Sequence, residues 1–350
     1  MDRDGRSQAL SAGYGKYKLE ILSMRFTHSA LAVMMLVMMT PPVQAAKRLG
    51  PPIEELQSTP DRVRIVAATA GDNSTPGQIL FKVSERLSGE SPDVIELRTD
   101  AESHADVEIG EPYIVAWSYM RRNRAVKGGW EKDPDGPSIV TIMGLGSPAL
   151  FRQTEELSFL FSPGTIDDPA LKAEQLDALL AQMARNDAHA RGLAVAELYL
   201  REDLAETFSP ERAAQLKSLF ESSAMTPQHL ELLIRAALEV PGELTDPWLA
   251  EELRRIIIQH GTQYDLASFV PALVRTAARG LQQTGSAGDI GLLTLLLYSN
   301  NPGVAKAATA AMNAIDPDAA AARARQALER GWIHSETRRA LTVYLQGGRI

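Results

Sequence analysis

The sequence predicts an α+β multidomain protein, in which a small five-stranded β-barrel or sandwich precedes an all-α solenoid. Three observations support this fold class. Short runs that alternate apolar and polar side chains fill residues 61–150, as in half-buried strands. Beyond Phe151 the apolar spacing becomes helical, with apolar residues three and four positions apart. Through residues 151–350, Asp, Asn, Ser or Thr followed by Pro recurs at short intervals, which is a signal for the first residues of helices.

The N-terminal region carries the pattern of an export signal. Arg25 precedes an apolar run from Ala30 to Met39, and small residues follow as far as Ala45. A basic residue, a short apolar core and a small-residue end are typical of a cleaved signal peptide. We interpret residues 24–45 as that peptide, cleaved near Ala45, and residues 1–23 as an extension upstream of the start. An uncleaved anchor or a buried helix is the alternative.

The amino-acid composition limits the cellular compartments and the classes of partner that we expect. The 350 residues contain no cysteine, so the chain has no disulfide framework and no cysteine for a lipid anchor. Together with the export signal, this predicts a bacterial periplasmic or secreted protein with no transmembrane segment after cleavage. The net charge of -8 argues against a broad nucleic-acid surface. We therefore expect a protein partner or an envelope component, and no nucleic acid.

The β region follows a Pro-rich spacer at residues 46–60. Turn residues separate its five expected strands, and one such turn is Asp133-Pro134-Asp135-Gly136. This turn lacks the glutamate that closes a calcium-binding loop, so we expect no calcium there. The five expected strands are Val63 to Ala67, Ile79 to Val83, Val94 to Arg98, Tyr113 to Tyr119 and Ser138 to Met143.

Part of this region, residues 78–143, resembles the netrin-like, OB-type barrel family, which includes tissue inhibitors of metalloproteinases. The resemblance lies in the runs Ile79 to Glu85, Val94 to Arg98 and Gly110 to Val115. In that family the strand after a Gly-x-x-Tyr turn completes the barrel, and Gly110 and Tyr113 hold those places. The resemblance implies an OB-type fold. It does not imply metalloproteinase inhibition, because the inhibitors reach zinc with an N-terminal cysteine that this chain lacks.

The helical region divides into five expected helix pairs. Their first helices start 30 to 41 residues apart, around the period of two-helix repeats, and five pairs suffice for a stable stack. An irregular helical domain with ordinary caps is the alternative. The expected first helices start near Asp168, Ser209, Asp246, Ser286 and Asp316, and the second helices near Asp187, Thr226, Asp265, Asn301 and Ser335.

One of these units is similar to a HEAT repeat. Its apolar run Leu292 to Leu297 is followed by Asn300-Asn301-Pro302 and then by the Ala-rich run Ala307 to Ile315. In HEAT repeats an apolar first helix turns at Asp/Asn-Pro, and an Ala-rich second helix packs behind it. The resemblance implies a HEAT-like array over residues 151–350 that acts as a scaffold for a partner.

No catalytic, cofactor or metal site emerges from the sequence. Histidines beyond the signal peptide are at least 31 residues apart, which excludes a local H-x-x-x-H zinc motif. His104 beside Asp106 is interpreted as a turn rather than a general base, and His260 before Gly261 as the end of a helix. The segment Gly144 to Ser147 is interpreted as a strand-to-helix connector.

One basic cluster is a candidate contact for an anionic ligand or a partner. It lies in a long connection between two expected strands, with aromatic residues on both sides, and such groups can hold phosphates or acidic protein surfaces. A solvated hairpin loop is the alternative. The cluster consists of Arg121, Arg122, Arg124 and Lys127, flanked by Trp117 and Trp130.

Two functions follow from this architecture. The favoured one is an exported, non-enzymatic interaction or scaffold protein that binds another protein or an envelope component through its helical repeats. The alternative is an envelope enzyme or enzyme regulator with a site at the junction of the two domains, near Gly144 to Phe151. Polar side chains from successive second helices would favour binding, whereas a tight pocket holding His104 with a carboxylate would favour catalysis.

Overall fold

The computed structural model describes residues 50–71, 77–99, 107–123, 125–126, 129–330 and 332–348. The expected signal peptide and upstream extension, His104, and the cluster residues Arg124 and Lys127 lie outside these ranges. Among the helices described, none combines the length and the apolar character needed to cross a bilayer.

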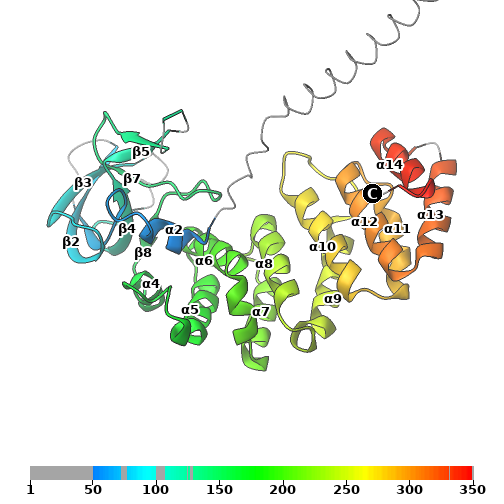
Figure 1. Cartoon of the computed structure of the whole chain (residues 1–350), viewed down its shortest axis with the longest axis horizontal. Coiled ribbons are helices and arrows are strands. Elements are labelled where there is room, and N and C mark those ends of the chain that lie inside the picture. Colours follow the sequence, from blue (N-terminus) through cyan, green and yellow to red (C-terminus); the bar gives the residue numbers. More distant parts are fainter. Residues whose placement is uncertain are drawn as a thin grey trace, which may run out of the picture. The chain divides into compact units, whose positions relative to one another are not determined.

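The first domain is a closed five-stranded barrel (Figure 1). Its strands follow one another in the order β1-β2-β3-β7-β4, and the pairing of β1 with β4 closes the ring. The expected β domain is thus confirmed as a barrel. The strands are β1 (Arg64–Gly71), β2 (Gln78–Ser88), β3 (Val94–Arg98), β4 (Pro112–Ser118) and β7 (Ser138–Ile139).

The barrel differs from expectation after β4. Strand β7 is only two residues long, and the Gly144 to Ser147 segment leads into a further strand, β8 (Leu150–Arg152), that pairs with β4. The expectation of a strand-to-helix connector there was therefore wrong. A short hairpin also forms from β5 (Met120–Arg122) and β6 (Trp130–Lys132). Strands of three residues are too short to show a periodic apolar pattern, which is why the sequence did not reveal them.

Strands β1 and β4 are buried on both faces. Val66 and Ala68 of β1 belong to the barrel interior, which Trp117 of β4 also fills. The alternate residues Ile65 and Ala67 belong instead to the core that continues into the helices. A strand with two buried faces has an unbroken apolar run, so β1 lacks the alternation seen in β3. The outer faces of these strands therefore share a hydrophobic core with the helices, whereas the barrel interior forms a core of its own.

Two short helices flank the barrel. Helix α2 (Pro52–Gln57) forms within the segment expected to be a spacer, and its Ile53 is fully buried. Helix α4 (Glu155–Phe161) starts at Thr154, whose side chain accepts a hydrogen bond from the Leu157 N–H. Because α2 packs against α6 of the helical domain, its apolar residues serve the shared core rather than a linker.

The helical domain is a two-layer stack of helix pairs (Figure 1). Each first helix contacts the first helix of the next pair, and each second helix contacts the next second helix. We call these the first-helix layer and the second-helix layer. The pairs are α5 (Lys172–Ala184) with α6 (Ala188–Leu200), α7 (Pro210–Glu221) with α8 (Pro227–Glu239), α9 (Gly242–His260) with α10 (Val270–Thr284), α11 (Ile290–Leu296) with α12 (Pro302–Ile315), and α13 (Pro317–Glu329) with α14 (Ser335–Leu345). Short 3-10 turns, η1 (Pro169–Leu171), η2 (Glu202–Thr207) and η3 (Ala287–Asp289), join some of them.

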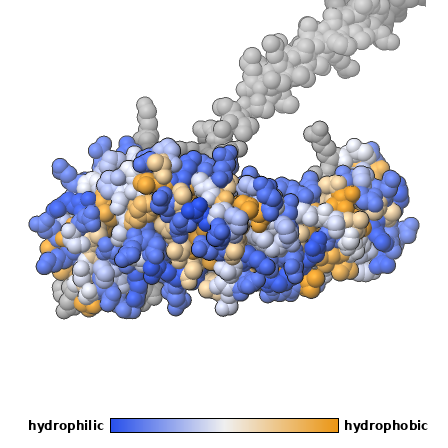
Figure 2. All heavy atoms as spheres, turned by 90° about the horizontal axis from the view of Figure 1, so that it is seen from below, coloured by the Kyte–Doolittle hydropathy of each residue, from blue (hydrophilic) through white to orange (hydrophobic). Residues whose placement is uncertain are grey.

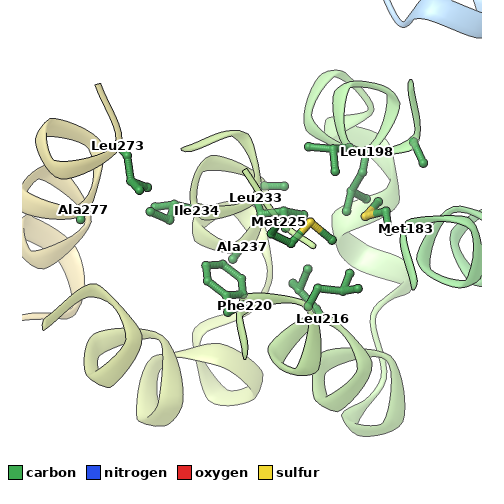
Figure 3. Close-up of a cluster of buried hydrophobic side chains, with 14 of the residues drawn as sticks. Met183, Leu198, Leu216, Phe220, Met225, Leu233, Ile234, Ala237, Leu273 and Ala277 are labelled. Atoms are coloured by element: carbon green, nitrogen blue, oxygen red, sulfur yellow. The ribbon is translucent and has the colours of Figure 1, made fainter. Parts of the chain in front are cut away.

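Side chains from both layers interlock between the helices. Figure 3 shows Phe220 of α7, Ile234 and Ala237 of α8 and Leu273 of α10 together in this core. Each of these residues is at most 2% exposed. Burial of this kind contributes roughly 1.5 to 3 kcal/mol for a large apolar side chain, so the stack is held mainly by packing.

Most of the expected helix starts are confirmed. The side chains of Asp187, Ser209, Thr226 and Asp316 each accept a hydrogen bond from a backbone N–H in the first turn of the helix that follows. Asn301 does the same for α12, accepting from two N–H groups. These side chains satisfy donors that a helix leaves unpaired at its N-terminus.

Two expected starts were wrong. Asp246 is not a cap, because α9 begins at Gly242 and Pro247 lies inside the helix. A proline in the second turn removes one backbone hydrogen bond, and an Asp-Pro pair alone does not distinguish this case from a true start. Helix α10 begins at Val270 rather than near Asp265, whose side chain instead accepts from the Ala267 N–H in a turn.

Arg191 forms hydrogen bonds to the turns of the first two helix pairs. Its guanidinium donates to the carbonyls of Met183 and Arg185 at the end of α5, and to Ala224 in the turn before α8. Arg338 holds the corresponding place in the last pair, donating to the carbonyls of the turn after α13. Each arginine is the fourth residue of a second helix, so the two pairs repeat one structural device.

Candidate functional site

A polar network runs across three consecutive second helices. Arg235 of α8 donates to Glu231 at 2.9 Å and to the hydroxyl of Tyr199 on α6 at 3.3 Å. Thr276 of α10 donates to the same Glu231 carboxylate oxygen at 3.1 Å. Polar side chains thus join three successive helices of the second-helix layer, with Thr276 buried between them.

Three cations continue this surface onto α10 and α12. Arg275 passes over Gly303 of α12, with its Cδ 3.6 Å and its Nη1 3.7 Å from where a Cβ on that glycine would lie. Arg279 is four residues from Arg275 on α10, and Lys306 is three residues from Gly303 on α12. Residues three or four apart are neighbours on a helix surface, so Arg279 lies near Arg275 and Lys306 near Gly303. We call Arg275, Arg279 and Lys306 the basic strip.

The cations of the basic strip have no carboxylate partner within the described part of the chain. Neither α10 nor α12, both described in full, contains Asp or Glu. The Nε of Arg275 is buried and has no hydrogen-bond acceptor among the described residues. A buried donor without an acceptor is costly, but an atom buried in this way lies out of reach of an outside ligand. An anionic group would therefore meet the terminal Nη atoms of Arg275 instead.

Two arginines of the first-helix layer are paired with carboxylates. Arg212 on α7 forms two hydrogen bonds to Asp177, and this contact raises the pKa of Arg212. Arg254 on α9 does the same with Asp289, and that bond holds the pKa of Asp289 below its ordinary value. Both pairs belong to the first-helix layer or its turns. The basic strip therefore carries positive charge that its own surroundings leave uncompensated.

The two described arginines of the basic cluster, Arg121 and Arg122 on β5, are engaged with carboxylates. Arg121 bonds Glu131 at 2.6 Å, and this hydrogen bond raises the pKa of Arg121. Arg122 bonds Glu55 of α2 at 2.7 Å and lies 4.8 Å from the ring centroid of Trp130. The structure thus brings Arg122 and Trp130 together, as the sequence grouped them.

Trp117, the other flanking aromatic residue, is 0% exposed inside the barrel. Its position in the chain suggested the cluster, but on β4 its side chain points to the barrel interior. Trp117 is therefore no part of the exposed surface. The contact of Arg121, Arg122 and Trp130 with an anionic ligand stays a prediction.

A cavity of about 370 Å³ lies where the barrel meets the helices. Leu150 of β8 and His189 of α6 line it, together with an ion pair between Glu108 and Arg152. The Glu108 contact raises the pKa of Arg152. Asp187, also in the lining, is occupied as the cap of α6. The carboxylates of this cavity thus already have structural partners.

A second hollow, of about 470 Å³, lies beside α2 and α6. Its two cations, Lys172 and Arg201, both contact Asp203. The hydrogen bond from Arg201 lowers the pKa of Asp203 to about 2, so the carboxylate stays ionised. The lining also includes Glu54, Asp167 and Asp168, so the hollow carries a net negative charge and does not favour an anionic ligand.

A buried carboxylate, which the sequence did not reveal, fastens α2 to the helical domain. Glu197 of α6 is 0% exposed, and its Oε2 accepts the Ile53 N–H at 2.8 Å. Its Oε1 has no hydrogen bond among the described residues, and the Arg201 Nη1 is 4.0 Å away. Burial raises the pKa of Glu197 to about 7, against the lowering effects of the Ile53 bond and Arg201. The nearby Glu54 and Asp203 add to the rise.

The histidines within the described ranges form no metal site, and no group of three or more His, Asp or Glu there is placed to hold an ion. His260 is the last residue of α9 and precedes Gly261, whose φ is +63°, so its expected place at a helix end is confirmed. Burial, together with Arg255, lowers the pKa of His260. Burial, together with the positive charge of Arg191, likewise lowers the pKa of His229.

Comparisons with known proteins assign no family to the chain. No family model, curated protein or solved structure matches it. The likenesses to netrin-like barrels and HEAT repeats therefore rest on the residues and the geometry of this chain alone.

Proposed function

We propose that this chain is an exported, non-enzymatic interaction protein that binds another protein or an envelope component through the second-helix layer. One observation carries the proposal, namely the uncompensated basic strip on α10 and α12. No carboxylate of the described residues pairs with these cations, and neither helix contains Asp or Glu, so the strip attracts an anionic group from a partner. Figure 2 views the molecule from below, from the side of α5, α7 and α9 in Figure 1, and on that face hydrophobic residues are scattered among hydrophilic ones.

The architecture supports a HEAT-like description of the array. Helix pairs that stack layer on layer create a long surface, and proteins of this kind commonly serve as scaffolds. In this proposal the netrin-like or OB-type barrel anchors the array through the shared core. It closes the first end of the stack, and its Ile53–Glu197 hydrogen bond holds α2 against the first pair.

Export is the second part of the proposal. It rests on the signal-peptide pattern of residues 24–45 and on the absence of cysteine. The partner is then sought outside the cytoplasm, in the periplasm or the medium.

Affinity capture from envelope extract tests the proposal. The immobilised chain from Ala46 onward is expected to retain a partner. A variant with all three basic-strip cations changed to Gln is expected to retain at least about tenfold less, because two or three charge contacts are lost. The matched control removes the same charge from the first-helix layer through Lys217→Gln, Arg323→Gln and Arg325→Gln, and retains the partner. Failure of the natural chain to retain any partner under gentle conditions contradicts the proposal.

The junction cavity supports the alternative of an enzyme or enzyme regulator. Its volume suits a small molecule, and it combines His189, the Glu108–Arg152 pair and apolar Leu150. An activity that is lost on His189→Asn while partner capture is unchanged would favour this alternative.

A further inference from the structure

We propose that the basic strip binds an acidic polypeptide segment, one rich in Asp and Glu, supplied by the partner. The inference rests on the proposed function and names the chemical class of its ligand. It concerns Arg275, Arg279 and Lys306, which form no ion pair with a carboxylate among the described residues.

The arrangement of the cations fits a chain better than a single small anion. Arg275 and Arg279 are one turn apart along α10, about 6 Å by helix geometry, and Lys306 lies on α12, whose axis is about 8 to 10 Å from that of a packed neighbour. An extended polypeptide spaces side chains of one face about 7 Å apart. Carboxylates two residues apart therefore match the spacing of the strip, whereas one phosphate reaches at most part of it.

Arg275 is the centre of the proposed contact. Its planar guanidinium can donate two parallel hydrogen bonds to a carboxylate through the two Nη atoms, whereas its buried Nε lies out of reach of an outside ligand. Gly303 beneath it has no side chain, which lets Arg275 lie against α12 beside Lys306. A carboxylate placed there would contact cations from two helices at once.

The polar network around Glu231 limits how far the ligand extends toward α8. Glu231 on α8 accepts from Arg235 and from Thr276, the residue next to Arg275. Its carboxylate repels an acidic segment that extends toward α8, so the ligand is directed toward α10 and α12. A long polyanion such as nucleic acid is disfavoured for the further reason that the chain as a whole carries -8.

Fluorescence anisotropy with the chain from Ala46 onward tests the proposal. The probe is a labelled twelve-residue peptide of alternating Glu and Ser, compared with Gln-Ser and Lys-Ser peptides. We expect only the Glu-Ser peptide to bind, and its affinity to fall at least tenfold between about 50 mM and about 300 mM salt. The basic-strip Gln variant is expected to lose at least tenfold in affinity, while the Lys217, Arg323 and Arg325 control binds like the natural chain.

A charge reversal keeps the test decisive. Arg279→Glu with Lys306→Glu is expected to abolish binding of the Glu-Ser peptide and to create binding of the Lys-Ser peptide. Circular dichroism and thermal melting confirm that each variant is folded. Equal loss in the strip and control variants overturns the proposal, as does equal binding of the Glu-Ser and Gln-Ser peptides.

A further experiment distinguishes an anionic membrane from an acidic peptide as the ligand of the basic strip. Vesicles of phosphatidylglycerol that bind through the strip while the Glu-Ser peptide does not would overturn the acidic-segment proposal. If the vesicles bind and the Glu-Ser peptide does not, capture of a partner through the second-helix layer would still support the proposed function. If the natural chain captures no partner from envelope extract but still binds the Glu-Ser peptide, the proposed function is contradicted and the acidic-segment proposal is not.

Discussion

Replacing Arg191 with Met is expected to lower the free energy of unfolding by about 3 to 5 kcal/mol. Arg191 is 5% exposed and donates hydrogen bonds to the carbonyls of Met183, Arg185 and Ala224. Methionine fills much of the volume but donates no hydrogen bond, so three carbonyls lose their donor. Because these carbonyls belong to the turns of two helix pairs, the loss loosens the contact between the pairs.

Urea unfolding followed by circular dichroism measures this effect. Arg338→Met is the matched control, because Arg338 makes the same kind of contact in the last pair but is less buried. We expect its cost to be about 1 kcal/mol. A loss below about 1 kcal/mol for Arg191→Met would show that the turns do not depend on this side chain.

Replacing Glu197 with Gln is expected to stabilise the protein at pH 8 by up to about 3 kcal/mol and to remove a fall of stability with rising pH. The pKa of Glu197 is raised to about 7 from an ordinary value of 4.5, chiefly by burial. Between these two values the folded chain keeps a proton that the unfolded chain has lost. The free energy of unfolding therefore falls as pH rises through this window, and the whole contribution is gone above pH 7.

The Gln variant isolates the charge of Glu197 from its hydrogen bond. Gln keeps a carbonyl oxygen to accept the Ile53 N–H but cannot ionise, so the variant and the natural chain are expected to converge below pH 4.5. Thermal melting between pH 4 and pH 8 gives both curves. Glu202→Gln on the exposed neighbouring turn η2 is the control and is expected to leave the slope unchanged. An unchanged slope in the Glu197 variant would mean that this carboxylate is ionised throughout.

Local chemistry explains what the sequence could predict. A cap such as Asp187 or Asn301 acts on N–H groups two or three residues away, so the pattern at one helix start is enough to place it. The five-stranded barrel followed from runs of residues such as Val94 to Arg98, whose alternation reports one buried face. Both signals are complete within a few residues.

Contacts between distant residues explain what the sequence could not predict. The Ile53–Glu197 bond joins positions 144 residues apart, and nothing near either residue indicates it. Helix α2 was missed because its prolines suggested a spacer, although Ile53 and Leu56 are buried by the helical domain. The choice between a cap and an internal proline at Asp246 also depends on packing upstream of it.

The basic strip could be predicted from the sequence only in part. Arg275 and Arg279 lie one turn apart in a helix without acidic residues, and this could have been noticed in the sequence. Their approach to Lys306 depends on Gly303 and on the stacking of α10 against α12. The cluster around Arg121 was visible instead because it is contiguous, yet its described arginines are paired with Glu131 and Glu55.

Site-specific photo-crosslinking is the most direct test that the second-helix layer binds a partner. A photoreactive amino acid replaces Gln282, which is exposed on α10 and three residues beyond Arg279, or Gln215, which is exposed on α7 of the first-helix layer. Irradiation in envelope extract is expected to join a partner to the chain from position 282 and not from position 215. Crosslinks from position 215 alone, or equally from both positions, would contradict binding by the second-helix layer.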